Sequence, residues 1–252
     1  MSNLILATPI LSDAATITAS TETTAGPVTN LQKMQLTDLW EAASTTPYCE
    51  IDLGSTQSFN LISLIGIYAS VLISWRVRTA TSQANLTAAP THDSGSVSVG
   101  AAMAGNHIWY WYSGLSNRWV RIDLVTTSPT YVGRLYISNA TEMTFNYQYG
   151  AQDGFDDDSI IDSTDGNNLI PNQGANRAVL DFTMNIRTEA ERHAIREINR
   201  LRGAANDVLV IKDPAATTNK TDLIYYGLLQ RRRQAVHTAF NLHNINYQLV
   251  SL

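Results

Sequence analysis

The segment from Thr188 to Gly203 (TEAERHAIREINRLRG) constrains the fold most, because it is the one stretch whose apolar residues recur at helical spacing. Thr188 and Glu191 have the spacing of a capping box, in which each side chain accepts a hydrogen bond from the backbone of the other residue. Gly203 suits the end of a helix, where a residue that tolerates positive φ is favoured. The segment therefore predicts a helix over 188–203 with one apolar face that needs a sheet to cover it. The residues of that face are Ala190, Ala194, Ile195, Ile198 and Leu201.

The sequences around this helix predict strands. Residues 177–187 alternate apolar and polar side chains, as in a half-buried strand. Residues 207–212 are apolar on both sides, which is typical of a strand covered on both faces. Two more strands are expected over 222–231 and 236–249, the second with a β-bulge near His243 and Asn244, where the alternation changes phase. The sequence predicts an antiparallel β-domain with one packed helix over residues 177–252.

The N-terminal half of the chain differs in composition. All five tryptophans lie there, and short apolar or alternating segments are separated by residues that favour turns. This pattern is typical of a β-sandwich or jelly roll, which we expect over residues 15–145. Its strands are expected over 49–54, 59–68, 74–79, 108–112, 118–124 and 131–137, with long loops over 79–106.

Two segments lie outside these domains. Residues 146–176 contain Asp-Gly and Ile-Pro pairs and are expected to be a linker with loops, in which Ser159–Asp162 could form a short strand. Residues 1–14 are expected to hold an N-terminal strand over Leu4–Leu11, which could join the sheet of the C-terminal domain. The fold class expected is mainly β.

Charge and cysteine content exclude several classes of protein. The net charge of −5 gives no electrostatic reason to expect nucleic-acid binding. The single cysteine, Cys49, excludes an intrachain disulfide framework. The first residues lack a basic segment, and their apolar run is broken by Pro9 and Asp13, so we expect neither a signal peptide nor a membrane span.

The sequence contains no recognisable catalytic motif. The five histidines lack the spacing of zinc ligands, and the glycine patterns of a nucleophile elbow, a P-loop or a Rossmann turn are absent. We therefore expect no enzyme and no cofactor. Asp153, Asp156, Asp157 and Asp158 could gather oxygen ligands for Ca²⁺, but the EF-hand spacing is missing and a solvated linker is favoured.

Aromatic and basic residues supply the candidate contacts. Trp109 and Trp111 share one face of the strand IWYWY and, with Trp40, could contact a glycan or a partner protein, although core packing is favoured. Two groups of arginines could lie at a subunit interface or in solvent. They are Arg192, Arg196 and Arg200 on the helix, and Arg231, Arg232 and Arg233 at the end of the strand expected over 222–231.

The N-terminal segments resemble a known module. The order of Trp40, the sequence IDLG at 51–54, the strand at 59–68 and RWVRIDL at 118–124 resembles the galactose-binding-like jelly roll of discoidin-type domains. The lead-in PVTNLQ at 27–32 is similar to that module as it occurs in tail proteins of tailed bacteriophages.

The C-terminal segments VLVIKDP at 208–214 and IYYGLLQ at 224–230 resemble distal tail and baseplate proteins, whose β-domain is akin to the tail tube. This resemblance implies a virion structural protein at the tail tip, assembled in the bacterial cytoplasm as a hexameric ring on the tail tube. Its jelly roll would face baseplate hub or fibre proteins, or a host glycan. The alternative is a carbohydrate-binding module protein that recognises cell-surface glycans.

Overall fold

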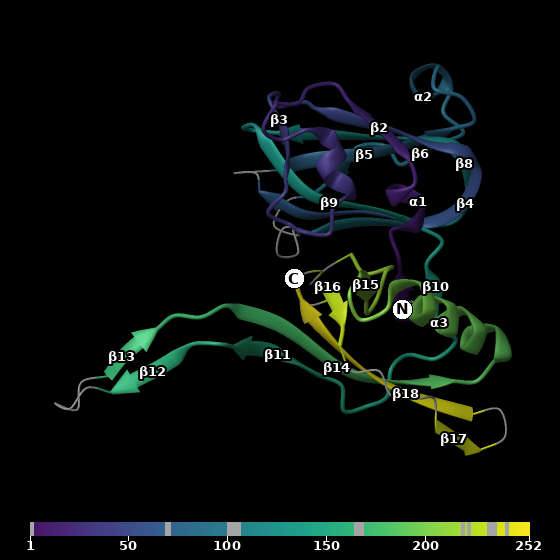
Figure 1. Cartoon of the computed structure of the whole chain (residues 1–252). Coiled ribbons are helices and arrows are strands. Elements are labelled where there is room, and N and C mark those ends of the chain that lie inside the picture. The colour runs from purple at the N-terminus through teal and green to yellow at the C-terminus, as the bar shows by residue number, and fades with distance from the viewer. Residues whose placement is uncertain are drawn as a thin grey trace. The chain divides into compact units, whose positions relative to one another are not determined.

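A computed structural model describes residues 3–68, 72–99, 107–163, 169–217, 220, 223–230, 236–239 and 242–252 (Figure 1). The chain divides into two compact units, Met1–Glu142 with Leu209–Ile224 and Met143–Val208 with Tyr225–Leu252. Both units are built mainly from antiparallel strands, and the expected fold class is confirmed. Among the described residues, no helix is long and apolar enough to cross a membrane.

The first unit contains a β-sandwich of the jelly-roll class. Its strands follow the order β3-β9-β4-β8-β5-β6, while β2 pairs with β4 and β7 pairs with β5. The bounds are β2 Thr16–Ala19, β3 Trp40–Ala42, β4 Tyr48–Tyr68, β5 Leu72–Ala80, β6 His92–Asp93, β7 Val97–Ser98, β8 Ile108–Thr126 and β9 Thr130–Ser138.

Strands β4 and β8 are longer than the sequence predicts, because each joins two segments that we expected to be separate strands. The pairing of β4 with β8 shifts in register between Asp52 and Gln57, and Gly54 in this stretch has a φ of 77°. Glycine tolerates positive φ without steric cost, so the strand bends here instead of ending. The bend lets β4 pair with β2 near its start and with β9 near its end.

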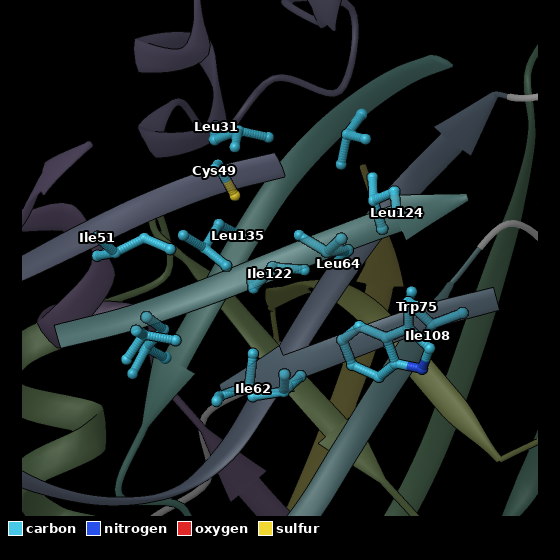
Figure 2. Close-up of a cluster of buried hydrophobic side chains, with 14 of the residues drawn as sticks. Leu31, Cys49, Ile51, Ile62, Leu64, Trp75, Ile108, Ile122, Leu124 and Leu135 are labelled. Carbon is cyan, nitrogen blue, oxygen red and sulfur yellow. The ribbon is translucent and has the colours of Figure 1, made fainter. Parts of the chain in front are cut away.

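The core of the sandwich is built from the inward-facing side chains of these strands (Figure 2). Ile51, Leu64, Ile122 and Leu135 are all fully buried. Burial of one such side chain stabilises a fold by about 1.5–3 kcal/mol. Cys49 belongs to the same cluster, and burial raises the pKa of its thiol to about 12, so it packs as a small apolar residue.

Short elements complete the first unit: α1 Ile10–Asp13, the 3₁₀ helix η1 Val28–Gln32 and α2 Asn85–Ala88. Strand β1, Ile5–Ala7, pairs with β10, Thr141–Glu142, and with residues 209–211 of β15, Asp207–Ile211. The strand expected over Leu4–Leu11 is shorter in the structure, since α1 begins at Ile10, and it pairs with β15, one of the strands expected in the C-terminal domain. Of the expected long loops over 79–106, the described part also contains β6 and β7.

In the second unit, a sheet packs against helix α3, Glu189–Arg202. Strand β14, Asn176–Ile186, lies between β18, Leu242–Ser251, and β11, Gln152–Asp157. The capping box of Thr188 and Glu191 is present, and Ile195 is 1% exposed. The predicted apolar face is only partly covered, since Leu201 is 47% exposed.

Three details of the second unit differ from the sequence prediction. The segment expected to be a linker contains β11, which gives no alternating apolar signal because it buries no face. The short strand expected at Ser159–Asp162 is present as β12, Ile160–Ser163, and pairs with β13, Leu169–Asn172. The expected bulged strand over 236–249 is two strands, β17 Val236–Ala239 and β18, which pair with each other. The bulge expected near His243 and Asn244 is absent there, since β18 pairs with β14 in continuous register through both residues; the register shift lies between His237 and Ala239 in the pairing of β17 with β18. The strand expected over 222–231 is β16, Ile224–Leu229, in the described residues.

Candidate functional site

Three aromatic rings meet at one edge of the sandwich and form what we call the aromatic cluster: His92, Tyr110 and Tyr112. Tyr110 and Tyr112 are two residues apart in β8, so their side chains leave the strand on the same side. Their rings are nearly parallel, 4° apart in orientation with centroids separated by 6.2 Å. The His92 ring, from β6, lies 4.3 Å from the Tyr112 ring and 5.7 Å from the Tyr110 ring.

Two rings of the cluster, Tyr110 and His92, are held in place by contacts, and the third ring, Tyr112, is exposed. Trp75 in the core meets the Tyr110 ring edge to face, with the centroids 6.5 Å apart. The Tyr110 hydroxyl lies 2.9 Å from Nε2 of His92, which holds both rings in place. Tyr112 is 45% exposed, so one ring remains available to a ligand while its neighbours are anchored.

Burial favours the neutral forms of His92 and Tyr110 in the cluster. Burial lowers the pKa of His92, although the neighbouring Asp93 carboxylate opposes the shift. Burial also raises the pKa of the Tyr110 phenol, with further contributions from Tyr112 and Asp93. The hydrogen bond between His92 and Tyr110 thus joins two neutral groups, and the histidine tautomer determines which of them donates.

A charged pair lies next to the cluster. Nε of Arg76 donates to Oδ1 of Asp93 over 2.8 Å, and the guanidinium makes a second contact with the other carboxylate oxygen. The hydrogen bond from Arg76 is the main reason that the pKa of Asp93 falls to about 2. The backbone N–H of Gly95 also donates to Asp93, so the carboxylate has a fixed position. The Arg76–Asp93 pair therefore has a fixed geometry on strands β5 and β6.

None of the three residues of this cluster was among the candidate contacts predicted from the sequence. Alternation along IWYWY shows that Tyr110 and Tyr112 share a face. The approach of His92 depends on the pairing of β5 with β6, in which Thr79 lies opposite His92, and no local pattern in the sequence specifies this pairing. The aromatic contacts predicted from the sequence were the tryptophans Trp40, Trp109 and Trp111 instead.

The structure places the three predicted contact tryptophans apart from the cluster's exposed ring. Trp40 is fully buried, and its indole N–H donates to the carbonyl of Thr21. Trp109 is 4% exposed, its indole N–H donates to the carbonyl of Pro214, and the Lys220 ammonium lies 4.7 Å from its ring. Trp111 is half-buried. Contact of these residues with a glycan or a partner stays a prediction.

Three of the six predicted interface arginines, Arg192, Arg196 and Arg200, lie on α3. Arg192 and Arg200 pair with Glu189 and Glu197, one helical turn earlier on the same surface. Arg196 is exposed. Arg231, Arg232 and Arg233 lie outside the described residues.

The acidic run lies on and just after β11. Asp153 accepts a hydrogen bond from the Tyr225 hydroxyl, and Asp158 pairs with Arg177. Over the described ranges, no group of three histidine, cysteine, aspartate or glutamate side chains is placed to hold a metal ion.

Comparison with known proteins gives structural likeness only. No family model matches the chain, and no curated protein matches it. A chitosan-binding module of a chitosanase/glucanase from Paenibacillus sp. IK-5 is 17% identical, with a TM-score of 0.40 over 49% of this chain and 94% of that one.

Two further structures are similar at the same level. A Streptococcus pneumoniae fucose-binding module is 12% identical, with a TM-score of 0.40 over 49% of this chain and 90% of its own. The family 32 carbohydrate-binding module of NanJ from C. perfringens, solved with galactose, is 11% identical, with a TM-score of 0.40 over 53% and 98%. These TM-scores are below 0.5, so the candidate site is defined by the geometry of this chain alone.

Proposed function

We propose that this chain is a non-enzymatic binding protein whose sandwich holds a saccharide at the aromatic cluster. The observation that carries the proposal is the Tyr112 ring, 45% exposed and flanked by the anchored rings of His92 and Tyr110. A pyranose ring presents a face of C–H groups that packs on an aromatic ring, while its hydroxyls need polar partners at the rim. Placed aromatic and polar groups of this kind are what a small-ligand site requires.

The neutral state of the cluster favours a neutral sugar over a charged one. Neutral His92 carries one N–H donor and one acceptor nitrogen, and the Tyr110 hydroxyl donates and accepts, so each can exchange their mutual hydrogen bond for one to a sugar hydroxyl. The Arg76 guanidinium is already paired with Asp93, so the site has no unpaired cation among these groups to attract an anionic sugar. The ligand class proposed is a neutral cell-surface glycan.

Replacing Tyr112 tests this site directly. Titration of the full chain with neutral oligosaccharides, followed by NMR, should show shifts at Tyr112 and its neighbours. Tyr112→Ala should weaken binding about tenfold, since an aromatic contact is worth about 0.5–1.5 kcal/mol beyond its buried area. Tyr68→Ala is the matched control, because Tyr68 is 48% exposed in β4 of the same sandwich. Equal affinities for both variants would refute a site at the cluster.

A second candidate function is the structural role at a phage tail tip, with assembly into a hexameric ring. The observation that favours it is β11, in which every residue is exposed and Phe155 is 74% exposed. A strand edge with an exposed aromatic side chain is a suitable surface for a neighbouring subunit. In this proposal the chain is located in the virion, and its partners are the tail tube and baseplate hub or fibre proteins.

Light scattering combined with negative-stain microscopy of the purified protein tests this second candidate. A closed ring that Phe155→Asp dissociates would support it. A monomer at every accessible concentration would remove self-assembly as an activity of the isolated chain.

A further inference from the structure

The sheet of the second unit has a face that is polar along its length. In β14, Leu180, Phe182, Met184 and Ile186 are buried, whereas the intervening side chains point to the opposite face. Helix α3 contacts the buried face, where Asn199 donates to the hydroxyl of Tyr247 over 2.7 Å. In the part of this unit that the structure describes, α3 is the one helix, and it packs on the buried face, which leaves the other face without a helix.

This polar face is hollowed into a groove of about 220 Å³, which we call the polar groove. The pairing of the strands aligns the side chains that line it: Gln152 lies opposite Asp181, which lies opposite Gln248, and Thr183 lies opposite Asn246. Gln148 enters from the segment before β11, anchored by its backbone N–H, which donates to the carbonyl of Thr183 over 2.8 Å. Tyr149, whose side chain is fully exposed, belongs to the same lining.

The lining offers donors and acceptors side by side. Thr183 donates its hydroxyl hydrogen to Oδ1 of Asn246 over 2.6 Å, which leaves the amide N–H groups of Asn246 to donate elsewhere. Nε2 of Gln248 lies 3.4 Å from Oδ2 of Asp181, a long contact that leaves the carboxylate able to accept more hydrogen bonds. A hydroxyl group both donates and accepts, so a surface of amides and one carboxylate matches a ligand rich in hydroxyls.

Charge narrows the class of ligand. Among the described residues that line the polar groove there is no lysine or arginine, and Asp181 is the one carboxylate. The neighbouring depression adds Asp153 and Asp156 and again no cation. An anionic ligand would be repelled by these carboxylates without compensation. The ligand that fits is neutral.

We propose that the polar groove is a second saccharide site, which binds a neutral oligosaccharide through the amides of Gln152, Asn246 and Gln248 and the carboxylate of Asp181. The exposed Tyr149 ring provides an apolar surface for a sugar face at the side of the groove. This site is separate from the aromatic cluster and shares no residue with it. Its existence does not depend on the function proposed for the sandwich.

The test is NMR titration of the full chain with a neutral and an acidic oligosaccharide of equal length. Side-chain amide resonances report on the groove directly, because its ligand contacts are made by asparagine and glutamine. We expect shifts at Gln152, Asn246 and Gln248 with the neutral sugar. The acidic sugar should bind at least tenfold more weakly. Stronger binding of the acidic sugar, or no shift at these amides, would overturn the proposal.

Matched variants separate the two sites. Asn246→Ala should weaken binding at the groove about fivefold to tenfold, the loss of one or two hydrogen bonds of ordinary strength. Asn172→Ala is the control, because Asn172 is an exposed amide on β13, outside the groove. Tyr112→Ala should leave the groove amide shifts intact. If Tyr112→Ala abolishes those shifts, the groove is not a site of its own. If Asn246→Ala weakens binding at the groove and Tyr112→Ala does not, the groove is a site whatever happens at the cluster.

Discussion

The two units bury their strands to different degrees. In the sandwich, β9 has almost all of its side chains buried, and β4 contributes seven buried residues in succession near its C-terminal end. In the second unit, β14 is buried on alternate residues and β11 on none. The sandwich is stabilised by its own core, whereas much of the second unit's sheet faces outward. Substitutions in the core of the sandwich should therefore cost the most stability, and substitutions on the exposed strand of the second unit should cost the least.

The largest effect is expected from Trp40→Ala. Trp40 is fully buried, and its removal leaves a cavity and an unpaired Thr21 carbonyl, so the sandwich should lose about 3–5 kcal/mol of unfolding free energy. All five tryptophans lie within residues 40–119, so their fluorescence during denaturant unfolding reports on the first unit. A loss below about 1 kcal/mol would mean that the core is not packed as described.

A smaller effect, of about 1 kcal/mol, is expected from Thr188→Ala in the second unit. The Thr188 hydroxyl accepts from the backbone N–H of Glu191 over 3.1 Å, while the Glu191 carboxylate accepts from the N–H groups of Thr188 and Thr144. Hydrogen exchange of the α3 amides should become faster by about fivefold, with exchange in the sandwich core unchanged. Thr188→Ser, which retains the hydroxyl, is the control and should preserve protection.

The helix and the strands next to it show which parts of the fold can be predicted from the sequence alone. The capping box, the boundaries of α3 and strand β14 were predicted correctly because their signals are local. The merging of segments into β4 and β8 was missed, because a bend at Gly54 looks the same in sequence as a turn that ends a strand. Strand β11 was missed because it buries no face.

The candidate sites also combine features with a local sequence signal, which can be predicted, and features that depend on strand pairing, which cannot. The shared face of Tyr110 and Tyr112 is visible in the sequence, but the third ring, His92, arrives through strand pairing over a long separation. The polar groove depends on the registers of β11, β14 and β18, which bring Gln152, Asp181 and Gln248 into one row. Register is fixed by the whole sheet, so no single segment could reveal either site.

Beside the aromatic cluster, the Arg76–Asp93 pair predicts a modest dependence of sandwich stability on pH. The pKa of Asp93 is about 2 in the folded state, against an ordinary value of 3.8. Its contribution to the free energy of unfolding is therefore fully present at pH values above the ordinary pKa and is lost as the pH falls through the folded-state pKa. Both side chains are partly exposed, which limits the effect to about 1 kcal/mol or less. Between about pH 5 and about pH 2.5, Asp93→Asn should lose less stability than the unchanged chain. Identical slopes would show that solvent screens the pair completely.

The smallest effect on folding is expected at the exposed strand. Phe155 is 74% exposed on β11, so Phe155→Ser should change the unfolding free energy of the monomer by no more than about 0.5 kcal/mol. Hydrogen exchange of β14 at low protein concentration measures this, because β14 is the strand that pairs with β11. If Phe155 instead packs against a second copy, the same substitution should weaken association without altering the monomer. A large loss of stability at low concentration would mean that β11 is covered within its own chain, and the contrast between the two units would fail at that point.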